Sequence, residues 1–453
     1  LGPKGYDAVQ VSPPQEHIPG SQWWTRYQPV SYQLHSRSGG PAAFHNMTRR
    51  CTAAGVGVIV DAVINHMAGG SGRGILGTPF GARSYPGVGY SPSSFHHWPG
   101  DVGGNCAIEN WQNRTELQYC DLLGMPDLCT GCPGVQDTLA DYLTLVHSGN
   151  KRIGFRIDAA KHIHAPELTG IVKQAGHPFV FQEVIHGVGD EAVQPDGYFG
   201  NGRVTEFNLA RKMAPMVKAP AGLCGLKSFG KSWGLMPSTK AVTCVDNHDT
   251  QRGEAVLTYR DGPVYYLASM VLLALPYGYP KIMSGYAFED YNAGPPGYPV
   301  VCGDQWVCDH RRPEIANMVQ WRRVAGIAPI GGFQEDGCDR VAFHRGRAFL
   351  ALNRREEAWE ATVDTGLQPG LYCNIAVSDS PDACPVIRVS ATGTASFQVP
   401  PVGAVALHRR AVPQAGRVAG EALAAQPEEP EAGARVVEGV AGAAGAPEAV
   451  RAA

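Results

Sequence analysis

Residues 154–162 read Gly154-Phe155-Arg156-Ile157-Asp158-Ala159-Ala160-Lys161-His162, an apolar run that carries an arginine two positions before an aspartate. Side chains at i and i+2 of a β-strand point to the same face, so the segment predicts that Arg156 and Asp158 project side by side. A guanidinium beside a carboxylate favours its ionised form. An oriented, ionised carboxylate at the end of a strand can serve as a nucleophile. On this segment alone, a structural ion pair explains the two residues equally well.

Short apolar runs alternate with helical patterns over residues 1–330. Strands are predicted at 6–11, 56–61, 153–158, 179–183, 204–207, 241–245 and 279–283, with helices between them such as 42–54 and 263–275. This alternation predicts a parallel α/β barrel or a doubly wound sheet. Acids stand at or shortly after four of these strands, at Asp61, Asp158, Glu183 and Asp249. Because TIM barrels carry their active groups at the carboxyl ends of several strands, the pattern favours a barrel.

Three parts of the chain depart from this alternation. Residues 67–133 have little periodicity and much Gly, Ser, Pro and Asn, and they are too long for a structureless loop. They are expected to form a small inserted domain after the third barrel strand, between barrel segments 1–66 and 134–330. Residues 331–410, with turn residues at Arg345-Gly346, predict a C-terminal antiparallel β-sandwich. Residues 411–453 are nearly all Ala, Gly, Val, Pro and Glu, which predicts a disordered tail.

The composition indicates a globular protein with an uncharged ligand. Charged residues make up 17% of the chain, and the formal net charge is −3. Without a basic excess, neither nucleic acid nor an anionic membrane is expected as a partner. No apolar run reaches the roughly 18 residues of a membrane span. The 17 Tyr and 8 Trp suit an aromatic ligand surface, and a monomer is expected.

The twelve cysteines indicate an oxidising compartment and therefore secretion. Short spacings in polar segments predict the disulfides Cys106–Cys120, Cys302–Cys308 and Cys373–Cys384. Cys129 and Cys132 form a lone Cys-x-x-Cys without the context of a redox or zinc site, so they are expected to be a local disulfide or free thiols. The pairing of Cys224, Cys244 and Cys338 is left open.

Four segments carry a resemblance when taken together and in order. They are Asp61-Ala62-Val63-Ile64-Asn65-His66, the segment 154–162, Phe181-Gln182-Glu183-Val184-Ile185 and Val245-Asp246-Asn247-His248-Asp249. The chain resembles, in these segments, the four signature regions of the α-amylase family of glycoside hydrolases. The resemblance covers residues 1–408 and implies a (β/α)8 barrel. It also implies retaining endo-hydrolysis of α-1,4-glucosidic bonds in starch, glycogen and related α-glucans.

Two other functions remain open beside this one. The chain could be a relative that hydrolyses small maltooligosaccharides or transfers glucosyl groups, or a non-catalytic glucan-binding relative. The resemblance argues against the second of these, because it matches the family's catalytic acids. It makes Asp158 the nucleophile, Glu183 the general acid/base, and Asp249 the group that holds sugar hydroxyls and stabilises the transition state. The apolar neighbours of Glu183 are expected to favour its protonated form.

The family resemblance also assigns substrate contacts. Sugar rings stack on aromatic faces, and neutral imidazoles donate to hydroxyl groups without adding charge. Asp61 is expected to support His66 or Arg156 from below, without a catalytic role. The substrate contacts implied by the resemblance are Trp23, Trp24, Tyr27, Gln28, His66, Arg156, Lys161 and His248.

Two ions are implied by the resemblance. Asn65, Asp127 and His162, with a main-chain carbonyl near Gln118, match positions that ligate a structural calcium, although histidine is an unusual ligand for it. Such an ion would pin the insert to the barrel.

Residues 276–281 resemble the chloride-dependent animal and bacterial branch, where Arg156, Asn247 and Lys281 would hold Cl⁻. The anion would stand between Arg156 and the catalytic acids and offset the two cations below them. If Lys281 pairs instead with a carboxylate, no chloride is needed.

The start of the chain departs from the family pattern. Family members carry another strand and helix before Leu1, so the sequence is expected to be N-terminally truncated and to lack barrel strand one. A barrel with seven of its eight strands exposes two unpaired edges, which could impair folding. Cys51 would then lack its upstream disulfide partner.

Overall fold

The structure is a computed structural model that describes residues 1–97, 107–186, 191–253 and 255–414. Its centre is a curled parallel sheet of seven strands in the order β1-β2-β5-β6-β7-β8-β9. This confirms the α/β barrel class and the strands expected from the sequence. The strands are β1 (Ala8–Val11), β2 (Gly57–Ala62), β5 (Ile153–Ile157), β6 (Val180–Gln182), β7 (Arg203–Thr205), β8 (Ala241–Thr243) and β9 (Tyr279–Pro280).

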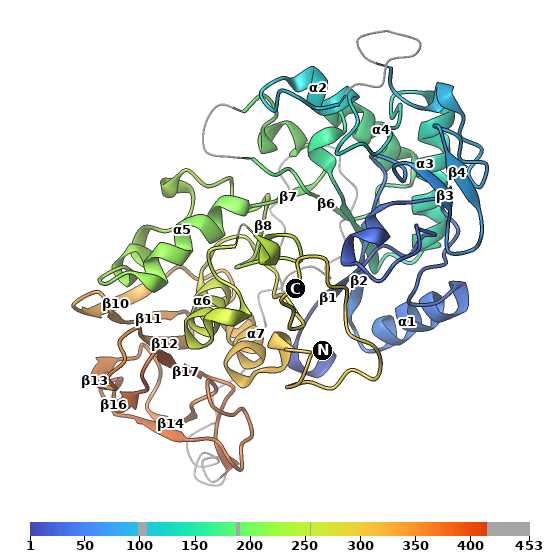
Figure 1. Ribbon diagram of the computed structural model, residues 1–453. Helices are drawn as coiled ribbons and strands as arrows, with labels where there is room; N and C mark the ends of the chain where they lie inside the picture. Colours follow the sequence, from blue (N-terminus) through green and yellow to red (C-terminus); the bar gives the residue numbers. More distant parts are fainter. Residues whose placement is uncertain (98–106, 187–190, 254, 415–453) are drawn as a thin grey trace.

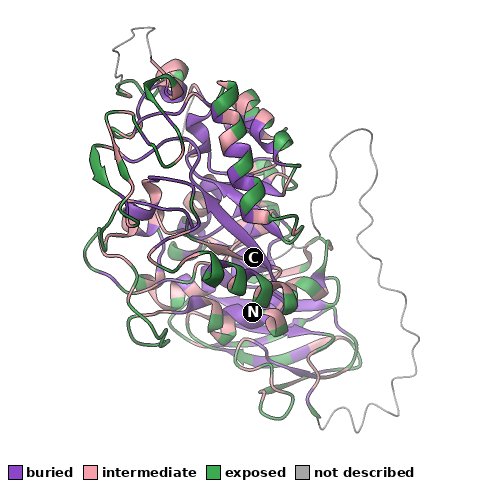
Figure 2. Ribbon diagram, turned by 90° about the vertical axis from the view of Figure 1, so that its right-hand side faces the viewer, coloured by how far each residue is buried: buried purple, intermediate pink, exposed green. Residues whose placement is uncertain are grey.

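The apolar runs form strands because both faces of this sheet are covered. Every residue of β2 and of β5 is buried. Strands covered on both faces need continuous apolar sequence, so the only charged groups they contain, Asp61 and Arg156, have to pair. Figure 2 shows the strands buried between helices whose outer faces are exposed. These helices are α1 (Pro41–Ala53), α3 (Pro133–His147), α4 (Ala165–Gln174), α5 (Phe207–Lys218), α6 (Pro263–Ala274) and α7 (Pro313–Ala325).

The sheet is open between β1 and β9, which form its two edges within the described residues. The prediction of seven barrel strands is therefore confirmed. One side-chain contact spans the opening, because the Lys281 ammonium donates to Gln10 Oε1 at 2.7 Å. The described structure thus connects the two edge strands through side chains in place of backbone pairing.

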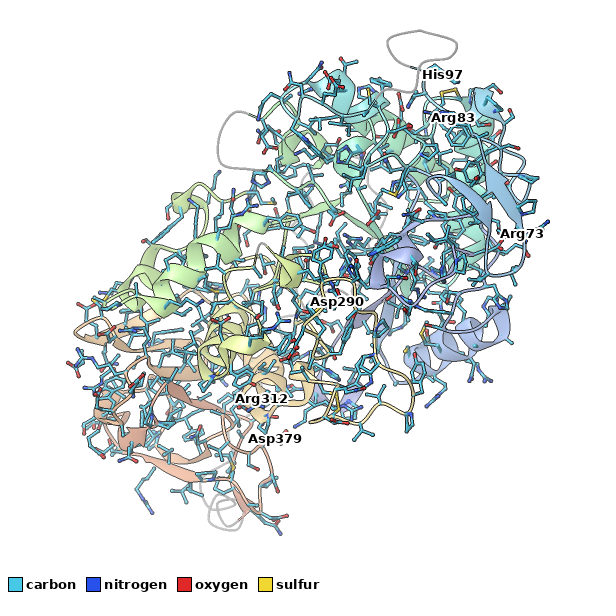
Figure 3. The ribbon with its side chains drawn as sticks, in the orientation of Figure 1. Arg73, Arg83, His97, Asp290, Arg312 and Asp379 are labelled. Carbon is cyan, nitrogen blue, oxygen red and sulfur yellow. A yellow bond between two sulfur atoms is a disulfide. The ribbon has the colours of Figure 1, made fainter. Side chains whose placement is uncertain are left out.

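The described residues between β2 and α3 form short helices and strands. They are β3 (Ser71–Arg73), β4 (Pro79–Gly81) and α2 (Arg114–Tyr119), and Figure 1 places them together beside α3 and α4. Arg83, labelled in Figure 3, pairs with Asp121 at 2.8 Å within this part of the chain. The loop-rich character expected here is therefore observed, and the boundaries 67 and 133 stay predictions.

The C-terminal part is all β and antiparallel. β10 (Gly331–Asp336), β11 (Arg340–Arg345), β12 (Ala348–Asn353) and β17 (Gly403–His408) form one sheet. Two separate two-stranded sheets pair β13 (Trp359–Asp364) with β16 (Thr394–Val399) and β14 (Gly370–Cys373) with β15 (Val386–Val389). The predicted hairpin at Arg345-Gly346 is confirmed by the pairing of β11 with β12. The tail predicted at 411–453 lies outside the described residues beyond residue 414.

Four disulfides are present in the part of the chain that is described. Cys302–Cys308 and Cys373–Cys384 confirm their predictions, and Cys129–Cys132 is also bonded. Cys224–Cys338, separated by 114 residues, was not identified from the sequence because only the fold brings these cysteines together. Cys120 is disulfide-bonded, and Cys106 lies outside the described residues. Cys51 and Cys244 are free thiols.

Among the helices described, none has the length and apolar character that crossing a membrane requires.

Candidate active site

The acids singled out from the sequence meet at one edge of the sheet. Asp61 lies in β2, Asp158 directly follows β5 and Glu183 directly follows β6. Asp249 lies in the loop after β8. Parallel strands end at the same edge, so residues far apart in the chain converge there.

Arg156 is the centre of this acid cluster, which consists of Asp61, Asp158, Glu183 and Asp249. Its Nη1 atom lies 2.6 Å from Asp61 Oδ1 and 2.8 Å from Asp158 Oδ1. Its Nη2 atom pairs with Glu183 Oε1 and lies 3.6 Å from Asp249 Oδ2. The predicted side-by-side placement of Arg156 and Asp158 is confirmed. The Arg156 guanidinium contacts the carboxylates directly in this structure, and an anion beside it stays a prediction.

The protonation of the acid cluster depends on burial and on repulsion among the acids. Burial raises the pKa of Asp158 well above its usual range, and the charges of Glu183, Asp61 and Asp249 add to that rise. Burial and the charge of Glu183 raise the pKa of Asp249 to about 7. Arg156 acts in the opposite direction on both but does not outweigh burial. Four acids share this one cation, so the influence of Arg156 on Asp158 is weaker than for an isolated pair. The cluster retains a proton near neutral pH.

The carboxyl group of Glu183 is not in apolar surroundings, which corrects the environment expected from its sequence neighbours. Oε1 accepts from Arg156, and Oε2 accepts from the Ala159 N–H at 2.9 Å. Ala159 has a φ of 48°, and this left-handed turn after Asp158 aims its N–H at Glu183. The neighbouring apolar side chains Phe179 and Phe181 belong to the sheet core instead.

Trp23, Trp24 and Tyr27 form an aromatic platform on the 3₁₀ helix Trp23–Tyr27. All three are half-buried, so they are not core residues. Tyr27 stacks on His248 with centroids 5.2 Å apart, and its hydroxyl donates to Asp61 Oδ2 at 2.9 Å. The platform therefore adjoins the acid cluster.

Trp24 and Gln28 are held by neighbouring loops. Trp24 Nε1 donates to Asn292 Oδ1 at 2.9 Å, and Gln28 Oε1 accepts from the Gly69 N–H at 3.1 Å. Both side chains are thus fixed by protein contacts at the edge of the platform.

The two histidines are neutral but placed differently. Burial lowers the pKa of His66 to about 4, and burial with the charges of Arg156 and Lys281 lowers that of His248 well below its usual value. His248 Nε2 lies 3.2 Å from Asp249 Oδ2. His66 Nε2 lies 3.0 Å from the Tyr27 carbonyl oxygen, and its Nδ1 lies 3.3 Å from Asn65 Nδ2. Both His66 nitrogens thus bind protein groups, and its direct contact with a sugar stays a prediction.

Three residues that contact predicted site residues were not identified from the sequence, namely Trp111, Glu191 and Tyr291. Lys161 is buried, and its ammonium pairs with Glu191 at 2.7 Å. Trp111 is 46% exposed and lies edge-on to His162 at 6.0 Å. An exposed tryptophan in a polar, aperiodic segment was a usable signal for Trp111. For Glu191 and Tyr291, whose ring contacts Trp23 at 6.3 Å, the sequence has no comparable signal.

The predicted calcium ligands lie where the insert meets β2. Asn65 and Asp127 are both buried, and Asp127 forms an isolated β-bridge with His66, the residue after Asn65. Asn65 Oδ1 is buried without a hydrogen-bond partner among the described residues. Burial and the charge of Asp121 raise the pKa of Asp127 well above its usual range, so a cation beside it would be stabilising.

His162 and Gln118 already have partners. His162 Nδ1 hydrogen-bonds the Leu117 carbonyl oxygen at 2.8 Å, and burial lowers the His162 pKa to about 4. The Gln118 amide donates to the Tyr198 hydroxyl at 3.2 Å. Among the described His, Cys, Asp and Glu side chains, the only group of three close enough to share one ion is Cys224, Glu335 and Cys338. The two cysteines of that group are already joined in a disulfide. A metal at Asn65 and Asp127 would therefore need amide and carbonyl oxygens as well.

The predicted chloride ligands Arg156, Asn247 and Lys281 lie next to the acid cluster or interact with its charges. Lys281 donates to a neutral amide, Gln10 Oε1, and within the described chain it has no ion pair with a carboxylate. Burial and the charge of Arg156 lower the Lys281 pKa, while nearby acidic groups act against this. Asn247 Oδ1 accepts from the N–H groups of Asp249 and Thr250 at 3.0 and 2.7 Å, which orients its amide and the Asp249 loop.

This fold, with acids at the carboxyl ends of several barrel strands, defines a glycoside hydrolase of the TIM-barrel class. Residues 333–410 match the family described as alpha amylase, C-terminal all-beta domain. The chain is 44% identical to an alpha-amylase of Streptomyces violaceus over 90% of this chain and 70% of that protein. It is 38% identical to pancreatic alpha-amylase of Sus scrofa over 88% of each. The crystal structure of wild-type alpha-amylase I from Eisenia fetida superposes with a TM-score of 0.83, at 34% identity, covering 90% of this chain and 93% of that one.

The chain belongs to the α-amylase family, as these relatives show. It is a glycoside hydrolase that cleaves α-1,4-glucosidic bonds within glucan chains.

Proposed function

We propose that this α-amylase works by retention, with Asp158 as nucleophile, Glu183 as general acid/base and Asp249 as transition-state stabiliser. One observation carries the proposal: Arg156 gathers all three carboxylates around a single guanidinium. Asp158 and Glu183 both contact that small group, which favours the carboxyl spacing of about 5 Å in retaining enzymes over the wider spacing in inverting ones.

The reaction has two steps. In the first, Glu183 donates a proton to the glycosidic oxygen while an Asp158 oxygen bonds to the anomeric carbon, and the leaving chain departs as an alcohol. In the second, Glu183 takes a proton from water, whose oxygen attacks the same carbon and releases the Asp158 carboxylate. The first step needs the proton on Glu183 and an ionised Asp158, and burial with mutual repulsion among the acids favours one shared proton in the cluster.

The platform and its neighbours would bind the glucan. Glucose rings would stack on Trp23, Trp24 and Tyr27, whose half-buried faces adjoin the acids. His248 beside Asp249 would donate to a sugar hydroxyl. The further proposed contacts are Gln28, His66, Arg156 and Lys161.

Calcium and chloride are part of the proposal. The unpartnered Asn65 Oδ1 beside Asp127 fits a hard cation, which would hold the insert against the barrel, with a carbonyl near Gln118 and His162 completing the set. Lys281 donates to a neutral amide and has no ion pair with a carboxylate among the described residues, which fits an anion shared with Arg156 and Asn247. Chloride there would offset the charge of the two cations beneath the acids.

Secretion and a monomeric state are proposed with the same function. Disulfides at several places in the chain support an oxidising compartment.

The test compares wild type, Glu183→Gln and the matched exposed-residue control Glu360→Gln in starch–iodine and reducing-sugar assays. We expect Glu183→Gln to lose activity by about 10³-fold or more and the control to keep it. Wild-type activity in Glu183→Gln would remove this assignment. NMR of the first-formed product should show the α-anomer, and a β-anomer would exclude retention. Release of internal fragments of mixed length would separate endo-hydrolysis from a maltooligosaccharide-specific or transferring enzyme.

A further inference from the structure

We infer that Arg252 is a positioning residue that holds the aromatic platform and the rim segment, residues 286–293, in register with the acid cluster. The inference rests on the roles proposed above for Asp249 and the platform. Arg252 ends the 3₁₀ turn Thr250–Arg252, which directly follows Asp249. Arg252 is half-buried and forms no ion pair within the described residues. Its guanidinium is held by hydrogen bonds to neutral groups and by contacts with aromatic rings.

The hydrogen bonds of Arg252 join two loops. Its Nη1 donates to the carbonyl oxygen of His248, the residue before Asp249. Its Nε donates to the Tyr291 carbonyl oxygen at 3.1 Å, and its Nη2 donates to the Tyr286 hydroxyl at 2.7 Å and the Ala293 carbonyl oxygen at 3.2 Å. One guanidinium therefore bonds the loop of Asp249 to both ends of the rim segment. Asp290, labelled in Figure 3, marks this segment near the middle of the molecule.

The flat faces of Arg252 contact the platform as well. Its guanidinium carbon lies 4.7 Å from the centre of the Trp23 ring and 4.3 Å from that of Phe288. Trp23 itself donates from Nε1 to the Tyr291 carbonyl oxygen at 3.0 Å. Trp23, the Asp249 loop and the rim segment thus converge on one side chain.

The geometry requires arginine in particular. A guanidinium donates from three nitrogens in one plane while its faces can stack on rings, whereas a lysine ammonium donates from a single nitrogen and has no flat face. Tyr291 is 56% exposed and beside Trp23, so the rim segment extends the platform outward. A glucan that lies along Trp23 and Tyr291 would be set relative to Asp249 by Arg252. Long chains, which reach Tyr291, would depend on it most.

The test compares Arg252→Lys and Arg252→Gln with the control Arg260→Lys. Arg260 also stacks on Phe288, at 4.5 Å, and donates to the Phe288 carbonyl oxygen, but its described contacts include neither His248 nor Trp23. For each variant, kcat and KM are measured on maltooligosaccharides of increasing length, together with product lengths and the melting temperature.

We expect Arg252→Lys to lower kcat/KM on long substrates by about tenfold to hundredfold. It should also abolish the decrease in KM with increasing chain length and shift the product lengths. Arg260→Lys should match wild type in all three. If both Arg252 variants keep wild-type kinetics and products and lose only melting temperature, Arg252 is merely structural and the inference is overturned. If the Arg252 inference fails but Glu183→Gln is inactive, the proposed function still stands. An active Glu183→Gln would contradict the proposed function itself.

Discussion

Asp61 Oδ1 lies 2.6 Å from Arg156 Nη1, so the arginine that gathers the catalytic acids is itself anchored by a carboxylate from the preceding strand. Asp61 also accepts from the Tyr27 hydroxyl at 2.9 Å. Asp61 thus connects the platform to the acid cluster without reaching the reacting bond.

Asp61→Asn should shift the acidic limb of the kcat/KM profile to lower pH. The Asp61 charge contributes to the raised pKa values of Asp158 and Asp249. Removing it lowers both, so the nucleophile Asp158 stays ionised down to a lower pH, by on the order of one pH unit. A pH–rate series on soluble starch measures this, with the exposed Asp137→Asn as control. An unchanged or upward-shifted limb would contradict the role of Asp61 in the shared titration.

Calcium removal should destabilise the wild type. At a calcium concentration of 100 times Kd, binding contributes about 2.7 kcal/mol, which a chelator removes. Asn65→Ala should start at a lower melting temperature and respond less to the chelator, because a ligand oxygen is gone. Calorimetry with and without EDTA checks this, with Asn46→Ala on the exposed face of α1 as control. Equal chelator responses in wild type and Asn65→Ala would exclude Asn65 as a ligand.

Chloride should accelerate the wild type and have no effect on Lys281→Gln. Without the second cation, the anion has little to offset and is bound weakly. Initial rates in chloride and in an equal concentration of gluconate measure the response, and the exposed Lys151→Gln should respond as wild type does. Equal wild-type rates in chloride and in gluconate would contradict the proposed anion site.

Loss of the Cys224–Cys338 disulfide should lower the stability markedly. It closes a loop of 114 residues between the 3₁₀ turn Leu223–Ser228 and the β10–β11 turn. Chain-entropy arguments give about 4–5 kcal/mol for such a loop. The double variant Cys224→Ser/Cys338→Ser, unfolded in denaturant beside the free-thiol control Cys51→Ser, measures this. A stability equal to that of the control would show that the link adds nothing to the folded state.

Local patterns were sufficient for most of the architecture. The strand at 153–158 and the helix at 42–54 follow from apolar periodicity, since these elements depend mainly on residues close in sequence. The acids were identifiable because each stands beside a strong strand signal. By contrast, Cys224–Cys338 and Arg252 depend on contacts between segments separated by many residues, and periodicity carries no information about such pairs.

The sequence by itself determined which side chains reach the barrel edge, because strand ends are encoded in short apolar runs. Only the tertiary structure decided their protonation and partners. Arg156 faces four carboxylates at once, burial outweighs its charge at Asp158, and Glu183 accepts from Arg156 and Ala159 although its sequence neighbours are apolar. Electrostatic energies depend on the distance between groups and on their exposure to water, and both are properties of the folded chain.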